Sequence, residues 1–119
     1  MAGYLYLCIV PLAGAAGLGY LAKPGRTMDL ERRLREHSRV GEGAFYALTF
    51  PNQDRAPLDD NHFAEKLLLT EFKRLFGKPE LGHEYFSASI ESAVEAFSNF
   101  CASLYSRHPD MALPMQTDD

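Results

Sequence analysis

The side chains that could carry acid–base or metal chemistry are few and scattered along the 119 residues. No two histidines are four residues apart, so no pair of metal ligands can share a helix face; they are His37, His62, His83 and His108. The chain has no Cys-x-x-Cys pair, no Gly-x-Ser-x-Gly elbow and no His-Glu-x-x-His motif. These absences predict that the chain is not an enzyme and has no catalytic residue, no metal ligand and no cofactor.

Two local groups of polar residues have a simple structural explanation. Residues 59–62 (Asp, Asp, Asn and His) are typical of the start of a helix, where such side chains accept hydrogen bonds from free N–H groups. Glu91 and Glu95 are four residues apart, which on a helix places both on one solvated face. Cys8 and Cys101 are interpreted as small buried apolar residues.

The N-terminal run determines how the rest of the chain is interpreted. Residues 1–22 contain no charged side chain. As a helix rising about 1.5 Å per residue, residues 3–22 would extend about 30 Å, the thickness of the hydrocarbon core of a bilayer. Tyrosines stand near both ends of the run, as they do at membrane interfaces. We therefore predict a transmembrane anchor over residues 1–24.

The small and basic residues in and after this run predict its surroundings. Small residues four apart let helices approach closely, and we predict a helix-packing face made of Ala13, Gly14, Gly17 and Gly19. Residues 23–39 hold six basic and three acidic side chains. We predict that a membrane-interface collar is formed by Lys23, Arg26, Arg32 and Arg33. Basic residues stay on the side from which a span inserts, which places the C-terminal part in the cytoplasm, the mitochondrial matrix or the stroma.

Three other interpretations of the apolar run stay open. A cleaved secretory signal fits its alanines, although no Lys or Arg precedes it. A nucleotide-binding loop fits the glycines at 14, 17 and 19, although their spacing is GxxGxG and no βαβ series follows. A buried element of a soluble domain is the third interpretation: runs this long without charge are uncommon there, but the glycines weaken the prediction of a span.

The remaining sequence predicts an all-α fold, in which the N-terminal transmembrane helix precedes a small helical region containing a helix hairpin. Apolar residues recur every three or four positions over about 60–76 and 84–106, which predicts two amphipathic helices packed antiparallel. Residues 44–50 are rich in aromatics, and whether they form a strand stays open. The predicted regions after the anchor are a basic juxtamembrane helix at 25–41 with Thr27 as its N-cap, an aromatic extended segment and loop at 42–59, the hairpin at 60–108 and an acidic tail at 109–119.

The segment from Gly14 to Arg26, with the charge step after it, resembles the N-terminal part of small single-span supernumerary subunits and assembly factors of mitochondrial respiratory complexes. The resemblance implies a non-catalytic accessory subunit, structural or for assembly, of an inner-membrane complex of the respiratory chain or ATP synthase, and hence of electron transport. Its implied location is the mitochondrial inner membrane, single-pass, with the C-terminal part in the matrix. Its implied partners are other subunits of the complex and the lipid bilayer.

The charge balance of the rest of the chain predicts that nucleic acid is not a partner. From residue 40 onward there are six basic and thirteen acidic residues, and the whole chain has a net charge of -4. Contacts to phosphates need clustered Lys and Arg. Two further functions stay open: a soluble protein–protein interaction module whose N-terminal apolar run is buried core, and an accessory subunit of a photosynthetic or bacterial membrane complex.

Overall fold

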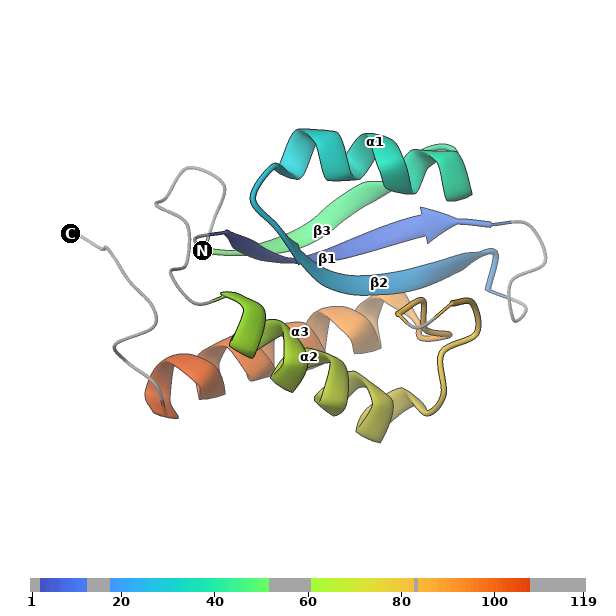
Figure 1. Cartoon of the computed structure of the whole chain (residues 1–119). Coiled ribbons are helices and arrows are strands. Elements are labelled where there is room, and N and C mark those ends of the chain that lie inside the picture. Colours follow the sequence, from blue (N-terminus) through green and yellow to red (C-terminus); the bar gives the residue numbers. More distant parts are fainter. Residues whose placement is uncertain (1–2, 13–17, 52–60, 83, 108–119) are drawn as a thin grey trace.

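The computed structural model describes residues 3–12, 18–51, 61–82 and 84–107 and has a mixed α/β fold. The elements are, in chain order, β1 (Tyr4–Pro11), β2 (Tyr20–Thr27), α1 (Leu30–Val40), β3 (Phe45–Phe50), α2 (Asn61–Phe76) and α3 (Ile90–Arg107). The strands form an antiparallel sheet in the order β2-β1-β3. Helix α1 covers one face of the sheet, and α2 and α3 cover the other (Figure 1). The predicted all-α fold is therefore wrong.

The N-terminal apolar run forms strands β1 and β2 rather than a membrane-spanning helix. The two strands pair along their length, from Tyr4 opposite Thr27 to Pro11 opposite Tyr20. Within the part of the chain that the structure describes, no helix is both long enough and apolar enough to cross a bilayer. The anchor over residues 1–24, the mitochondrial inner-membrane location and the matrix orientation are wrong, because all three depended on this helix. The alternative in which the run is buried core agrees with the structure.

Of the predicted helix-packing face, the structure describes Gly19 alone. Gly19 lies in the turn before β2, where its φ of 81° suits a residue without a side chain, and its carbonyl accepts a hydrogen bond of 2.9 Å from Leu12 N. Ala13, Gly14 and Gly17 lie outside the described residues.

Strand β1 is continuously apolar because both faces of the sheet are covered where it lies. Residues 5–10 are each at most 1% exposed. Successive side chains of a strand point to opposite faces. Leu5, Leu7 and Ile9 join the core under α2 and α3. The residues between them, Tyr6, Cys8 and Val10, join a second core under α1. A central strand with two covered faces therefore has no polar alternation that would distinguish it from a buried helix.

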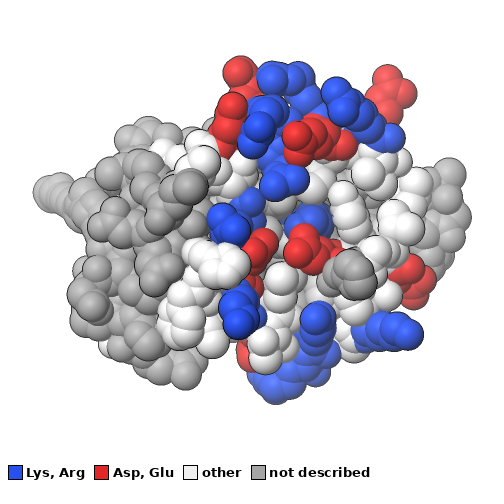
Figure 2. Space-filling view, viewed as in Figure 1, with Lys and Arg blue, Asp and Glu red and all other residues white. Residues whose placement is uncertain are grey.

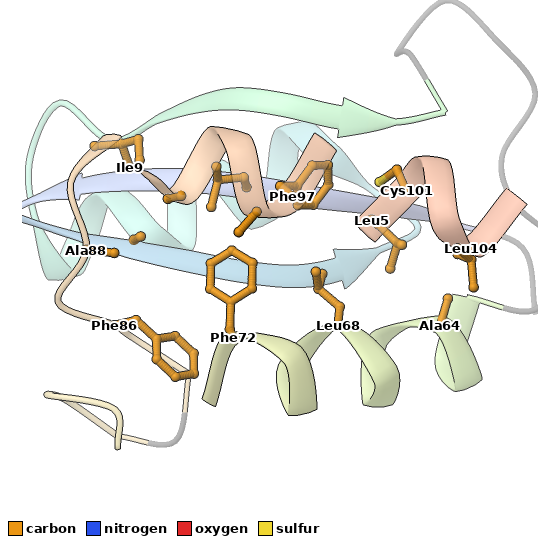
Figure 3. Close-up of a cluster of buried hydrophobic side chains, with 14 residues drawn as sticks. Leu5, Ile9, Ala64, Leu68, Phe72, Phe86, Ala88, Phe97, Cys101 and Leu104 are labelled. Atoms are coloured by element: carbon orange, nitrogen blue, oxygen red, sulfur yellow. The ribbon is translucent and has the colours of Figure 1, made fainter. Parts of the chain in front are cut away.

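The larger core lies between the sheet and the helix pair α2 and α3. Figure 3 shows Ala64, Leu68 and Phe72 of α2 directed at the sheet, with side chains of α3 beside them, among them Phe97 and Leu104. The two helices run antiparallel (Figure 1), as the hairpin prediction stated. Helix α3 begins at Ile90, later than the predicted residue 84, because the preceding segment extends along the outer edge of β2. There Ala22 and Phe86 exchange backbone hydrogen bonds of 2.9 and 2.8 Å.

The N-cap of helix α1 lies two residues later than the sequence predicted, and the end of the helix is held close to the sheet. Its N-cap is Asp29, whose carboxylate accepts a 3.0 Å hydrogen bond from Arg32 N, so the prediction of Thr27 was wrong. The Thr27 hydroxyl instead bonds the backbone of Asp29. The helix ends at Val40, and Gly41 then passes against β1 so closely that a Cβ there would lie 1.7 Å from the Pro11 carbonyl oxygen.

Candidate functional site

A polar pocket of about 420 Å³ opens along the β2 side of the molecule, between α1 and α2. In Figure 2, Lys and Arg side chains gather over α1 and, with acidic side chains among them, over the middle of this face. Four cationic and two carboxylate side chains line the pocket, with two tyrosines and a histidine. The lining residues are Tyr6, Lys23, Arg26, Thr27, Met28, Arg32, Arg33, His37, Glu65, Glu84 and Tyr85.

The four cations of the pocket are the residues that the sequence grouped as a membrane-interface collar. Lys23 and Arg26 lie on β2, and Arg32 and Arg33 lie on the first turns of α1. Because β2 leads into α1 through a short turn, the two pairs meet at one end of the sheet. The structure therefore brings these residues together around a pocket rather than beside the predicted span.

A chain of two hydrogen bonds joins two tyrosines through His37. The Tyr6 hydroxyl lies 2.8 Å from His37 Nε2, and the Tyr85 hydroxyl lies 2.9 Å from His37 Nδ1. Tyr6 is 1% exposed and His37 is 4% exposed, whereas Tyr85 is only partly buried. Since β1, α1 and the segment before α3 each supply one member, only the complete fold assembles this chain.

The surroundings of His37 keep its imidazole neutral. Burial, followed by the positive charges of Lys23 and Arg33, lowers the pKa of His37 to about 4. Glu36 and Glu84 oppose this shift. A neutral imidazole has one N–H donor and one nitrogen acceptor, so it donates to one tyrosine and accepts from the other.

This low pKa predicts an acid-sensitive fold. An unfolded histidine has a pKa of about 6.5 and takes up a proton that folded His37 refuses, so the free energy of unfolding falls as the pH drops from about 6.5 to about 4, by up to about 3 kcal/mol. Urea unfolding at pH 7 and pH 5 measures the loss. In the variant His37→Gln, whose amide keeps both a donor and an acceptor, this part of the loss is absent. An equal loss in both proteins would show that His37 is not the group responsible.

Lys23 lies between the two tyrosines and is held by Glu84. Its ammonium is 2.5 Å from Glu84 Oε1 and donates a 2.8 Å hydrogen bond to the Pro24 carbonyl. The same nitrogen lies 5.4 Å from the ring centre of Tyr6 and 5.9 Å from that of Tyr85. Burial lowers the pKa of Lys23, and the bond to Glu84 partly restores it. The positive charge of Arg33 opposes the effect of burial and favours negative charge on the Tyr6 oxygen.

Two arginines of the pocket are paired with carboxylates, and one donor of Arg33 has no partner within the described part of the chain. Arg26 forms an ion pair of 3.1 Å with Glu65, and Arg33 Nη1 bonds Glu36 at 3.0 Å. Among the described residues, the buried Nε of Arg33 has no hydrogen-bond partner. A buried donor without a partner costs free energy, which an anionic ligand would recover.

Gly25 makes room for the pocket's innermost groups. A Cβ on this residue would lie 2.6 Å from the Tyr6 hydroxyl and 2.7 Å from the Lys23 ammonium. Burial raises the pKa of Tyr6, so its phenol is protonated in the resting site. The arrangement can thus bind an anion at its guanidinium groups and move a proton at the Tyr6 oxygen.

The other residues discussed from sequence lie away from this pocket. Cys8 and Cys101 are free and buried, as predicted. Glu91 and Glu95 are exposed on α3, as predicted. His62 is exposed on α2, while residues 59, 60, 83 and 108 lie outside the described parts of the chain. Within those parts, no three His, Cys, Asp or Glu side chains gather as a metal site.

Sequence reasoning missed five ionisable members of the pocket: Tyr6, His37, Glu65, Glu84 and Tyr85. One local signal was present for His37, because it follows Arg33 by four residues and therefore shares its helix face. Tyr6 lay within the run interpreted as a membrane span, and Glu84 and Tyr85 within a predicted helix. Their meeting depends on contacts between residues 31 to 48 positions apart along the chain.

A family model matches most of the chain. Residues 3–101 match the T5orf172 domain, which is a GIY-YIG-like nuclease-related domain. The chain belongs to this family, since the match covers most of its length. No curated protein matches it, and no solved structure does. The predicted relationship to subunits of mitochondrial respiratory complexes is wrong, and with it the roles in the respiratory chain, ATP synthase and electron transport.

Proposed function

We propose that the pocket binds a phosphodiester group of a nucleic acid and that the chain cleaves it. The observation that carries the proposal is the buried Nε of Arg33, which has no hydrogen-bond partner among the described residues and belongs to a guanidinium that lines a mainly cationic pocket. Guanidinium groups match the geometry of phosphate oxygens. Membership of a nuclease-related family supports the same substrate class.

This proposal departs from two predictions made from sequence, that the chain is not an enzyme and has no nucleic-acid partner. Both remain predictions. The second was argued from the net charge of -4, which averages over the whole chain. Binding depends on the local electrostatic field, and the lining of this pocket contains four cationic side chains and two carboxylates.

The proposed reaction is hydrolysis. A water oxygen adds to phosphorus and loses a proton, the bond from phosphorus to the leaving oxygen breaks, and that oxygen takes a proton from solvent. Arg33 and Arg26 hold the phosphate and oppose the charge that develops on it. Tyr6 is the group that accepts the proton of the attacking water, because it lines the pocket and the positive charge of Arg33 favours charge on its oxygen.

The carboxylates of the pocket suit a divalent metal ion, which enzymes acting on phosphodiesters often use. Mg²⁺ is usually held by one or two carboxylates together with substrate phosphates and water. Glu84 and Glu65 are the two carboxylates in the lining, and each is in an ion pair that a phosphate would loosen by attracting its cation. When bound, the ion would neutralise charge on the phosphoryl oxygens.

Binding tests the role of Arg33. In Arg33→Ala we expect the affinity for a labelled DNA duplex to fall about tenfold or more, because a charge-assisted hydrogen bond contributes about 1.5–3 kcal/mol. The dependence on salt should weaken by about one counterion. Fluorescence anisotropy at several salt concentrations measures both quantities. The matched control is Arg35→Ala on the same helix, whose side chain is 65% exposed and does not line the pocket. Equal losses in the two variants would refute this pocket as the phosphate site.

Cleavage is tested separately with end-labelled DNA and RNA, each with Mg²⁺ and with a chelator. We expect cut products from at least one substrate in the presence of Mg²⁺. If neither nucleic acid is cut while binding still depends on Arg33, the catalytic half of the proposal is refuted and the binding half stands.

A further inference from the structure

We propose that Tyr6, His37 and Tyr85 form a proton relay that leads from the floor of the pocket to the surface. Tyr6 is the member that meets the attacking water, whereas His37 and Tyr85 act through it and are positioning residues. The inference rests on the proposed function, since it names the route taken by the proton that hydrolysis releases.

The direction of the relay follows from burial and from the donors present. Tyr6 is the most buried of the three and lines the floor of the pocket, and His37 Nε2 is an acceptor 2.8 Å from its hydroxyl. The neighbouring Lys23 ammonium has only donors, so it cannot take a hydrogen from Tyr6. Tyr6 therefore donates to Nε2, which leaves the imidazole proton on Nδ1. That N–H donates to the Tyr85 oxygen at 2.9 Å, and partly exposed Tyr85 can donate its own proton to water.

In a single concerted shift, each group passes a proton to the next, so that one proton is taken from the attacking water and one is released to solvent. Atoms and charges balance. The attacking water gives a proton to the Tyr6 oxygen as its oxygen bonds to phosphorus. Tyr6 gives its hydroxyl proton to His37 Nε2, His37 gives its Nδ1 proton to Tyr85, and Tyr85 releases its hydroxyl proton to solvent. All three side chains end neutral, with His37 in the opposite tautomer. Rotation of the hydroxyls and return of the imidazole proton to Nδ1 reset the chain.

Tyr85 is needed because the surroundings of His37 disfavour a positively charged imidazolium. Burial and the positive charges of Lys23 and Arg33 oppose an imidazolium, while Glu36 and Glu84 favour it more weakly. A histidine that accepts at Nε2 must therefore give up its Nδ1 proton at the same time, and the group in position to receive it is the Tyr85 hydroxyl. Without that hydroxyl, the reaction would have to place a charge on buried His37.

The ring nitrogens of His37 provide a test that does not depend on activity. In protein labelled with ¹⁵N, long-range proton–nitrogen spectra at pH 7 should show a neutral ring with its proton on Nδ1. In Tyr6→Phe the donor to Nε2 is gone, and the share of the Nε2–H tautomer should rise. An imidazolium, or a wild-type ring protonated on Nε2, would overturn the direction of the relay.

The kinetic test compares two tyrosines that lose only a hydroxyl. In Tyr85→Phe we expect the cleavage rate to fall about tenfold or more with DNA affinity unchanged, because part of the acid–base contribution is lost. The rate measured against the fraction of D₂O should curve in the wild type, where several protons move together, and become linear in Tyr85→Phe. The control is Tyr46→Phe: the Tyr46 ring packs 5.1 Å from Tyr6, but its hydroxyl donates to the Leu30 carbonyl.

The outcomes separate the two proposals. If the wild type cleaves and Tyr85→Phe behaves like Tyr46→Phe, the relay is refuted and the proposed function stands. If the wild type cleaves no phosphodiester, the proposed function fails and the relay has no reaction to serve, even where the Nδ1 proton is found as expected.

Discussion

Replacing Tyr6 with phenylalanine is expected to slow phosphodiester cleavage at least about 100-fold, the lower range for loss of a general acid–base group. The variant keeps the ring, which packs against Tyr46 and under Gly25, and loses only the oxygen that meets both His37 and the attacking water. The cations that bind phosphate are unchanged, so DNA affinity should stay within about twofold. Single-turnover cleavage at saturating protein measures the chemical step, and anisotropy measures binding.

The effect on folding is expected to be much smaller than the effect on rate. Removal of one buried hydrogen bond costs about 1 kcal/mol, and Tyr46→Phe, which also loses one hydroxyl bond, should be destabilised to a similar extent with a rate near the wild-type value. A Tyr6→Phe variant that cleaves as fast as Tyr46→Phe would remove Tyr6 from the reaction.

Gly41→Ala is expected to have the largest effect on stability, about 3 kcal/mol, at the upper end for overpacking. Its φ of -147° is open to any residue, so backbone strain plays no part. The cost comes from the added methyl group, which would lie 1.7 Å from the Pro11 carbonyl oxygen and 2.8 Å from a methyl of Val10. To fit it, α1 must move away from β1, and the core that contains Tyr6 must open.

The control for this variant is Gly77→Ala. Gly77 has a φ of 83° and open space where its Cβ would be, so the substitution introduces strain without a clash. It should cost about 1–2 kcal/mol. Urea unfolding measures the loss of stability in both variants and so compares the cost of the steric clash at Gly41 with the cost of backbone strain at Gly77. A loss in Gly41→Ala no larger than that in Gly77→Ala would show that α1 does not pack against β1 as closely as described.

The helices could be predicted from sequence because their signals are local. Helix α2 begins and ends within a residue of the predicted 60–76, since its apolar residues recur at helical spacing and glycine follows it. Helix α1 ends at Val40 with Gly41 as its C-cap, at the end of the predicted region 25–41. The start of α1 was missed because Thr27 and Asp29 are both good N-caps, and only the pairing of Thr27 with Tyr4 in the sheet decides between them.

The strands could not be predicted in the same way, because their stability comes from partners distant in sequence. A run such as residues 5–10 fits a span and a doubly covered strand equally well. Strand β2 contains Lys23, Pro24 and Gly25, which are poor strand formers, and it forms because β1 on one edge and Phe86 on the other satisfy its backbone. The proline is tolerated because β2 is an edge strand of the three-stranded sheet.

The basic residues of the pocket could be predicted as a group from the sequence, but its other members could not. The cluster of Lys23, Arg26, Arg32 and Arg33 stood out by charge, but charge alone does not distinguish a lipid headgroup from a phosphodiester. What distinguishes them is the set of neutral partners, and Tyr6, His37 and Tyr85 come from three segments that only the fold brings together.

The division of β1 between two cores ties the chemistry to the alignment of one strand. Leu5 and Leu7 belong to the core under α2 and α3, and Tyr6 between them belongs to the side of α1. A slip of a single residue in the pairing of β1 would exchange these faces, placing a phenol in the larger core and leucines around His37. Such a misaligned sheet would lose its packing and its reactive hydroxyl together. Correct alignment of β1 and the proposed activity therefore depend on the same residues.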